Sequence, residues 1–146
     1  INEALPRVVD ALIENGLRER IKVIASGKII TPAKVAWALA CGADVVNSAR
    51  GYMFALGCIQ ALRCHQNSCP TGITTHDPKL QRGLDVENKA ERVAAYTRNM
   101  NKEVEMIAHA CGLKHARDLR REHVRIVQPN GQSMALNMLY PYPPIR

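Results

Sequence analysis

The stretch IKVIASGKIITPAKVAWALACGADVVNSARGYMFALG, residues 21–57, decides the fold of this chain. It holds two short apolar runs, IKVIA at residues 21–25 and ADVVNS at residues 43–48. Short apolar runs bounded by polar turns are typical of buried strands in a parallel sheet. The segment between them, AKVAWALAC at residues 33–41, has the length and composition of a helix. Strand, helix and strand joined by short connections predict an α/β fold with parallel neighbouring strands.

The predicted helix between the two strands has recognisable end signals. Thr31 is a common N-cap residue, and Pro32 suits the first helical position, where a missing N–H costs nothing. Gly42 can adopt the left-handed backbone that closes many helices. A second helix is predicted directly after the second strand, over ARGYMFALGCIQALR at residues 49–63.

Helices are also predicted on both sides of this stretch. An amphipathic helix that breaks near Asn15-Gly16 is predicted from apolar residues at helical spacing, namely Leu5, Val8, Val9, Leu12, Ile13 and Leu17. We expect a long helix from Glu87 to Cys111 and a short one over residues 115–121. Residues 128–146 contain Pro129, Pro141, Pro143 and Pro144, so we expect an irregular, extended tail there.

Two parallel strands cannot complete a sheet, because their outer edges would stay unpaired. We therefore expect the strands to belong to a larger sheet, or to be covered by the tail or by a second copy of the chain. The chain begins with Ile1, and its first methionine is Met53. A processed product would begin in this way, but we expect a piece of a longer protein.

The amino-acid composition limits the kinds of molecule that the chain is expected to bind. The net charge is +7, but the basic residues alternate with acids, as in Arg18-Glu19-Arg20, and only one Phe and one Trp are available to stack on bases. We therefore expect no nucleic-acid partner. No apolar run approaches the roughly 18 residues of a membrane span, so we expect a cytoplasmic protein with no membrane contact. Cys41 and Cys111 lie in apolar helical contexts and are expected in the core.

Each predicted strand ends in a small polar turn. Ser26-Gly27-Lys28 follows the first strand, and Asn47-Ser48-Ala49-Arg50-Gly51 follows the second. Such turns bring backbone N–H groups close to an anion, and the next helix N-terminus adds partial positive charge. Lys28 can add a full charge, and Arg50 can bind two phosphate oxygens at once. A phosphate site across the two turns is one interpretation, and ordinary tight turns are the other.

Three cysteines, Cys58, Cys64 and Cys69, form the array C-x5-C-x4-C. Thiols this close together in an α/β chain indicate a metal or an iron–sulfur cluster. Three cysteines suit a cluster with about three irons, one for each thiolate. Zinc would add His65 to the set, but paired zinc ligands are usually two to four residues apart. Zinc and reduced structural thiols remain the alternatives.

No pair of nucleophile and base, and no pair of carboxylates, can be predicted from spacing, so the catalytic residues are unknown from the sequence. Asp44 precedes a predicted strand and is expected to be structural. Asp77, in His76-Asp77-Pro78, is expected to begin a turn through a side-chain bond to the backbone.

The stretch ASGKIITPAKVAWALACGADVVNSARGYMFALGCIQALRCHQNSCPTGITTHDP, residues 25–78, resembles the C-terminal part of the FMN-binding domain of glutamate synthase, or of a glutamate-synthase-related FMN protein. The resemblance extends over about residues 3–122, and the motif ALGC…CH…CP.GI.T.DP is its most specific part. It implies the last strands and helices of a (β/α)8 TIM barrel. Residues 1–127 would be this barrel segment, with a cysteine loop at 58–78, and residues 128–146 the tail.

The resemblance also implies cofactors and their ligands. Cys58, Cys64 and Cys69 stand where the family binds a 3Fe–4S cluster. The positions that fall where the family binds the FMN phosphate are Ser26, Gly27, Lys28, Ser48, Ala49 and Arg50. Family members typically have a Gly-Gly turn after the first strand, and Ser26 replaces one of these glycines.

By the same resemblance, the parent protein is a flavin- and iron–sulfur-dependent oxidoreductase that forms L-glutamate reductively from 2-oxoglutarate and glutamine-derived ammonia. Its expected partners are the remainder of the barrel, other subunits of the parent enzyme, and an electron donor, either ferredoxin or an NAD(P)H-linked subunit. We expect an oligomer, catalytic residues upstream of this chain, and no activity in the isolated segment. The alternative is a non-catalytic oligomeric α/β module with structural or zinc-bound cysteines.

Overall fold

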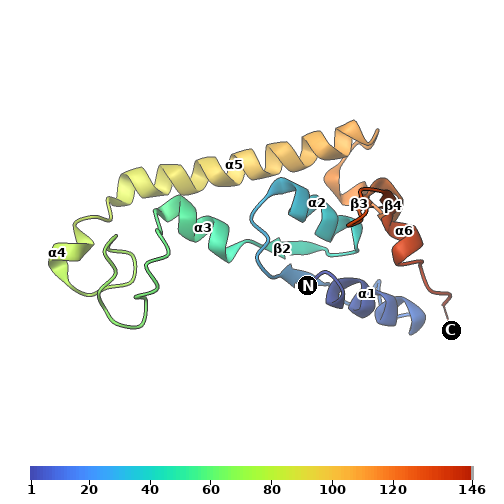
Figure 1. Cartoon of the computed structure of the whole chain (residues 1–146), viewed down its shortest axis with the longest axis horizontal. Coiled ribbons are helices and arrows are strands. Elements are labelled where there is room, and N and C mark those ends of the chain that lie inside the picture. Colours follow the sequence, from blue (N-terminus) through green and yellow to red (C-terminus); the bar gives the residue numbers. More distant parts are fainter. Residues whose placement is uncertain (146) are drawn as a thin grey trace. The chain divides into compact units, whose positions relative to one another are not determined.

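The computed structural model describes residues 1–145 and divides the chain into two compact units. The first unit consists of Ile1–Ser48 and the chain from Lys102 onward, and the second is Ala49–Asn101. The long helix α5, Val86–Ala110, begins in the second unit and ends in the first (Figure 1). Over these residues, no helix combines the length and the apolar character needed to cross a membrane.

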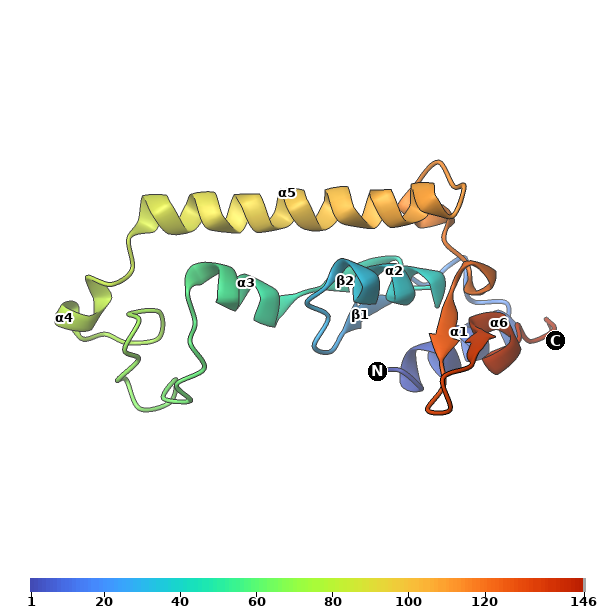
Figure 2. The same cartoon turned by 45° about the horizontal axis from the view of Figure 1, so that its top comes forward.

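The first unit contains the predicted strand–helix–strand motif. Strand β1 is Ile24–Ser26, helix α2 is Pro32–Ala40 and strand β2 is Val45–Asn47. The two strands pair in parallel, from Ile24 with Val45 to Ser26 with Asn47, and lie side by side in Figure 2. The α/β prediction is confirmed, although β1 begins three residues later than the apolar run.

Helix α2 has the end signals that the sequence predicts. The Thr31 hydroxyl accepts a hydrogen bond from the Lys34 amide at 3.4 Å, and Pro32 occupies the first turn. At the other end, Gly42 has a φ of +104°, in the left-handed region. A Cβ atom at Gly42 would lie 2.8 Å from Cγ1 of Val9, so glycine is also needed for the close approach of α1.

Helix α1, Ala4–Glu14, ends just before Gly16 as predicted, and packs on the core of the first unit. The core residues come from α1, β1, α2, α6 and the segments next to them, and they are Leu5, Val9, Ala25, Ile29, Ala38, Cys41, Ala43 and Leu136. Cys41 is 1% exposed, which confirms its predicted core position. Burial raises the pKa of its thiol to about 12, despite the positive charge of Arg121 nearby. Cys41 is therefore a packing residue with little thiolate character.

The C-terminal part is more regular than an extended tail. Its elements are η1 (Ala116–Asp118), η2 (Arg121–His123), β3 (Arg125–Val127), β4 (Ser133–Ala135) and α6 (Leu136–Leu139). Strands β3 and β4 form an antiparallel hairpin, which leads into α6 (Figure 2). The prediction of an irregular segment is therefore wrong for β4 and α6, because Gly131, with a φ of +81°, lets the chain turn back. Arg146, the end of the predicted tail, lies outside the described residues.

A buried arginine joins α1 to the C-terminal segment. Arg121 is 0% exposed and forms an ion pair with Asp10. Its guanidinium donates a hydrogen bond to the carbonyl oxygen of Tyr140 at 2.8 Å, and it lies 4.6 Å from the ring centroid of Tyr142. Two distant parts of the sequence thus share one charged contact inside the first unit.

Asp44 has the structural role that the sequence predicts. Its carboxylate accepts hydrogen bonds from the Arg18 guanidinium at 2.9 Å and the Val23 amide at 2.8 Å, and Lys22 lies 3.6 Å away. Burial on its own would raise the pKa of Asp44, but the Val23 hydrogen bond and the charges of Arg18 and Lys22 outweigh it and lower the pKa below 3.8.

Replacing Asp44 with asparagine should lower the free energy of unfolding by about 1–3 kcal/mol at neutral pH, because a charge-assisted hydrogen bond is lost. The folded pKa lies below the unfolded one, so the carboxylate stabilises fully above pH 3.8 and loses its effect as pH falls through the folded pKa. Urea unfolding followed by the fluorescence of Trp37 measures this. The difference between wild type and Asp44→Asn should shrink below about pH 4; a pH-independent difference would contradict the ionic explanation.

Two predictions about α5 had different outcomes. The helix itself is confirmed, since it runs over Val86–Ala110 and Gly112 follows with a φ of +78°. The predicted core position of Cys111 is wrong, because its side chain is exposed. The buried residues of α5 are Val104 and Ala108, and Cys111 follows the last helical turn, where the buried face of the helix ends.

In the second unit, α3 (Ala49–Leu56) packs beside α5. The rings of Tyr52 and Tyr96 meet edge to face at 5.1 Å, and the Tyr52 hydroxyl lies 3.0 Å from the Thr97 hydroxyl. The prediction that this helix continues to residue 63 is wrong. Gly57 has a φ of +101°, which ends the helix, and residues 57–77 contain no helix or strand (Figure 2).

The β1–β2 sheet is incomplete within the described residues, as the sequence predicts. It has two strands, and the side chains of Ile24 and Val45 are 61% and 46% exposed. Residues of this kind are normally covered on both faces of a parallel sheet. The tail therefore does not cover these positions.

Candidate functional site

The turns after β1 and β2 leave the sheet at the same edge. Ser26 pairs with Asn47 at the last position of the parallel register, so both turns follow at one end. The Ser48 hydroxyl donates a hydrogen bond to the carbonyl oxygen of Ile29 at 2.6 Å, which joins the second turn to the first. The structure therefore brings Ser48 close to the segment that follows Ser26, Gly27 and Lys28.

Ala49 and Arg50 open helix α3 and belong to the second unit. Both residues are exposed in the first turn of this helix. The guanidinium of Arg50 is therefore accessible, as a group that binds phosphate has to be.

An open hollow of about 1180 Å³ adjoins the first turn, and Ser26, Gly27 and Lys28 line one side of it. The other lining residues come from α1 with its preceding residues and from α2, and they are Ile1, Asn2, Glu3, Ala4, Arg7, Val8 and Lys34. Arg7, Lys28 and Lys34 line the hollow together with a single carboxylate, that of Glu3, so positive charge exceeds negative charge. This hollow suits an anionic group.

Two cations of this hollow, Arg7 and Lys34, were not among the predicted site residues. Lys34 could have been predicted from the sequence, because it stands in the first turn of α2, just after the N-cap Thr31. Helix N-termini favour anions, so a lysine there adds to an existing positive field. The position of Arg7 in the hollow could not have been predicted from the sequence, because only the packing of α1 against the sheet brings this side chain to the turn.

The three predicted metal ligands lie on the loop between α3 and α4, Pro78–Gln81. Cys58 and Cys69 are partly buried, Cys64 is exposed, and none forms a disulfide. Within residues 1–145, no group of three or more His, Cys, Asp and Glu side chains lies close enough together to hold a metal ion. The loop thus carries the right donor atoms, but it does not gather them around one point.

The thiol of Cys69 is more acidic than an ordinary cysteine thiol. The Thr71 hydroxyl, 3.3 Å from its sulfur, and the Thr74 backbone stabilise the thiolate and lower the pKa of Cys69 from 9.0 to about 6. The thiolate is the form that binds metals and clusters. At neutral pH, Cys69 is therefore already in that form.

The backbone of the cysteine loop is strained. Gln60, Leu62 and Asn67 have φ values of 57°, 56° and 55°. A left-handed backbone costs roughly 1–2 kcal/mol at each residue other than glycine. Asn67 is held by its contacts, since its side-chain oxygen accepts from the His76 amide at 2.6 Å and its carbonyl accepts from the Thr75 hydroxyl at 2.7 Å. Strain of this kind is common in segments that clamp a ligand.

Helix α4 anchors the end of the loop. Asp77 caps this helix through a hydrogen bond from the Lys79 amide at 2.8 Å, which confirms the predicted turn. Gly72 lies against the same helix, with a φ of +80° and space for no side chain, because a Cβ atom would lie 2.5 Å from the carbonyl oxygen of Leu80. The turn after Cys69 is therefore fixed by backbone packing.

Comparison with known proteins identifies relatives of the chain. The family model described as the conserved region in glutamate synthase matches residues 1–114. The chain is 45% identical over 139 residues to the glutamate synthase large subunit-like protein YerD of Bacillus subtilis (strain 168), covering 95% of the chain and 26% of the relative.

Two further relatives carry related names. The archaeal glutamate synthase (NADPH) of Methanocaldococcus jannaschii is 38% identical over 126 residues, 86% of the chain and 25% of the relative. The glutamate synthase (NADH) of Schizosaccharomyces pombe is 32% identical over 130 residues, 87% of the chain and 6% of the relative. The chain thus spans about a quarter of the length of the bacterial and archaeal relatives.

Proposed function

The chain belongs to the glutamate synthase family, and from that premise we propose that it is the cofactor-holding part of a larger flavin- and iron–sulfur-dependent oxidoreductase. The parent reaction is the reductive formation of L-glutamate from 2-oxoglutarate and glutamine-derived ammonia. The observation that carries this proposal is the family match over residues 1–114, which includes both the anion-binding hollow and the cysteine loop. The rest of the catalytic machinery lies elsewhere in the parent enzyme.

The hollow beside Ser26, Gly27 and Lys28 is proposed to bind the phosphate of FMN. When bound, FMN supplies the hydride and electron transfer of the reaction. Lys28 provides charge, and backbone N–H groups of the turn provide hydrogen bonds. The hydroxyl proton of Ser48 is directed at Ile29, so the backbone N–H groups of Ala49 and Arg50, at the start of α3, are the more suitable donors. On the second turn, the guanidinium of Arg50 supplies the positive charge that Lys28 supplies on the first.

Cys58, Cys64 and Cys69 are proposed to hold a 3Fe–4S cluster. When bound, such a cluster carries single electrons. The donor chemistry fits, since three free thiols share one loop and Cys69 is a thiolate near neutral pH. Since the structure does not gather the three sulfurs, binding has to draw Cys58 and Cys64 toward Cys69 and order the loop.

The remaining partners follow from the incomplete sheet and the length of the relatives. We propose that β1 and β2 are the last strands of a (β/α)8 barrel, and that the rest of the barrel covers Ile24 and Val45. Other subunits of an oligomeric parent enzyme and an electron donor, ferredoxin or an NAD(P)H-linked subunit, complete the system. The isolated chain should be inactive, because it lacks most of the barrel.

The test is to purify the full chain without oxygen and to measure iron, acid-labile sulfide and zinc, together with the visible spectrum. We expect about three irons per chain, one for each thiolate, and a brown absorbance. Cys58→Ser, Cys64→Ser and Cys69→Ser should each lose most of the iron.

Cys111→Ser is the matched control, because Cys111 is also an exposed, free cysteine but lies in the first unit. It should keep the iron of the wild type. One zinc per chain in place of iron would support the alternative, a non-catalytic oligomeric module with a zinc site. Iron that survives all three loop substitutions, or no metal in the wild type, would contradict the proposed ligands.

A further inference from the structure

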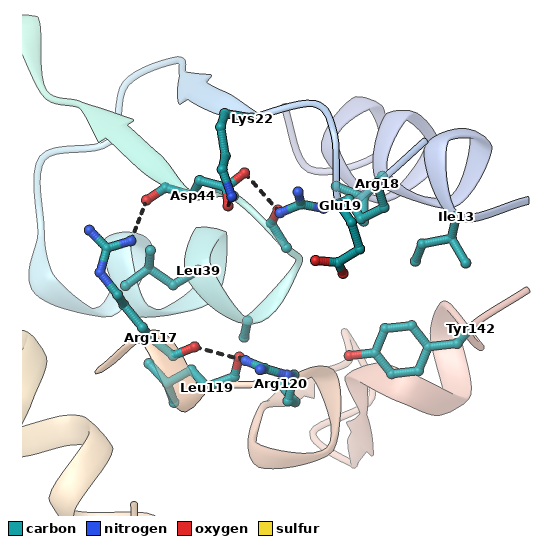
Figure 3. A pocket seen from close by; sticks show the side chains of 14 residues that line it. Ile13, Arg18, Glu19, Lys22, Leu39, Asp44, Arg117, Leu119, Arg120 and Tyr142 are labelled. Carbon is teal, nitrogen blue, oxygen red and sulfur yellow. Dashed lines mark hydrogen bonds and ion pairs between the residues drawn. The ribbon is translucent and has the colours of Figure 1, made fainter. Parts of the chain in front are cut away.

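A second cavity lies in the first unit at the amino ends of β1 and β2, opposite the turn of Ser26, Gly27 and Lys28. Its volume is about 360 Å³, within the range of small-molecule sites. Its walls come from helix α1, the connection from α1 to β1, the end of α2 with the turn before β2, and the chain from η1 to the tail (Figure 3). It is therefore distinct from the proposed FMN hollow.

The cavity has a surplus of positive charge. Its ionisable lining residues are four cations and two carboxylates, namely Arg18, Lys22, Arg117, Arg120, Glu19 and Asp44. The carboxylate of Asp44 is already paired with Arg18 at 2.9 Å and Lys22 at 3.6 Å. Two positive charges remain in excess, which matches a ligand with two negative charges.

The excess charge is held in place by the backbone. The Arg117 guanidinium donates to the carbonyl oxygen of Asp44 at 3.2 Å. The Arg120 guanidinium donates to the carbonyl oxygens of Arg117 and Leu119 at 2.8 and 2.9 Å. Within residues 1–145, neither arginine forms an ion pair with a carboxylate. Both guanidinium groups, which line the cavity, are therefore fixed by carbonyl oxygens, and no carboxylate pairs with either charge (Figure 3).

Other lining groups define the kind of molecule that fits. The Tyr142 hydroxyl accepts a hydrogen bond from the Arg121 amide at 3.2 Å, so its own proton is available to a ligand. The larger apolar side chains of the wall are those of Val9, Ile13, Leu39 and Leu119. The Glu19 carboxylate also faces the cavity (Figure 3), which limits the negative charge that the site can accept.

We propose that this cavity binds a small phosphorylated molecule through its phosphate dianion. A guanidinium matches the geometry of phosphate oxygens and can bind two of them, and Arg117 and Arg120 supply two such groups. The apolar wall accommodates the organic body of the ligand. Binding would join η1 and the tail to the connection that leads into β1, and would thereby stabilise the first unit. The site does not depend on FMN or on a cluster.

The test uses the full chain and inorganic phosphate as the probe. Phosphate is titrated by calorimetry at pH 7.5, with ionic strength held constant by chloride, and thermal unfolding is followed through Trp37. We expect saturable binding and a higher unfolding midpoint. Arg120→Gln removes one charge of the site and should weaken this binding at least tenfold. Lys22→Gln, at a side chain that is 72% exposed, should weaken it severalfold and, because the exposed pair with Asp44 contributes little, should lower the stability of the fold only slightly.

Two control variants test whether phosphate binds in this cavity and not elsewhere on the chain. Arg20→Gln makes the same charge change at an exposed residue outside the cavity and should leave binding unchanged. Lys28→Gln alters the proposed FMN hollow and should also leave this binding unchanged. The proposal is overturned if phosphate does not bind saturably, if Arg20→Gln weakens binding as much as Arg120→Gln does, or if Lys28→Gln alone abolishes it. If phosphate binding is lost only in Lys28→Gln, this cavity is not the phosphate site, whereas the proposed FMN site is supported.

Discussion

Arg121→Met is expected to lower the free energy of unfolding of the first unit by about 3–5 kcal/mol. The side chain is 0% exposed, so its removal leaves Asp10 without its charge partner and the Tyr140 carbonyl without its donor. An unpaired charge of this kind costs far more than the lost contact itself. Urea unfolding followed by Trp37 fluorescence measures the effect, because Trp37 packs against the core of the same unit.

Two further variants test the explanation for Arg121. Arg120→Met changes the neighbouring, exposed arginine and should cost about 1 kcal/mol or less. The double variant Asp10→Leu with Arg121→Met leaves no unpaired charge and should recover part of the loss. If the double variant is as unstable as the sum of the two single ones, the cost lies in packing and not in the charge pair.

Gly72→Ala is expected to destabilise the second unit by about 2–5 kcal/mol, combining the cost of a left-handed alanine with that of a forced backbone shift. The new Cβ atom would lie 2.5 Å from the Leu80 carbonyl oxygen and 3.2 Å from Cα of Gln81. Both atoms belong to the backbone of α4, so no side-chain rotation relieves the clash. Hydrogen exchange of the loop and of α4, measured by mass spectrometry, should show faster exchange there. The iron-loaded chain should also lose iron.

Gly131→Ala is the matched control for this substitution. Gly131 has a φ of +81°, against +80° for Gly72, but nothing lies within 4 Å of the position that a Cβ atom would take there. It should therefore show only the backbone cost of about 1–2 kcal/mol, confined to the β3–β4 hairpin. Equal effects at the two glycines would mean that the contact with α4 does not matter.

The sequence predicts the parts of the fold that depend on local signals. Thr31, Pro32 and Gly42 mark both ends of α2, and the structure confirms all three. The local signals mislead where two of them conflict. Ile59 and Leu62 continue the apolar spacing of α3, which predicts helix as far as residue 63, but Gly57 ends the helix and both side chains are exposed.

The candidate site shows the same division. The turn residues Ser26, Gly27 and Lys28 can be predicted from the sequence. Each predicted strand has to end in a turn, and parallel strands bring their turns to one edge of the sheet. The roles of Arg7 and Arg120 cannot be predicted from the sequence. Arg7 reaches the hollow beside Ser26, and Arg120 reaches the second cavity, each from an element far away in the sequence. Spacing alone places the three cysteines on one loop, but spacing does not determine how far apart the sulfurs lie.

The strained backbone at Gln60, Leu62 and Asn67 has a consequence for the lifetime of the protein in a cell. A loop that stores conformational energy without a ligand is the part of the chain that opens most readily, and exposed loops are the preferred sites of proteases. Newly made chains that never receive the proposed cluster would be cleaved there first. If the loop holds the proposed cluster, the same segment would serve as a checkpoint, so that incomplete molecules are removed before they accumulate.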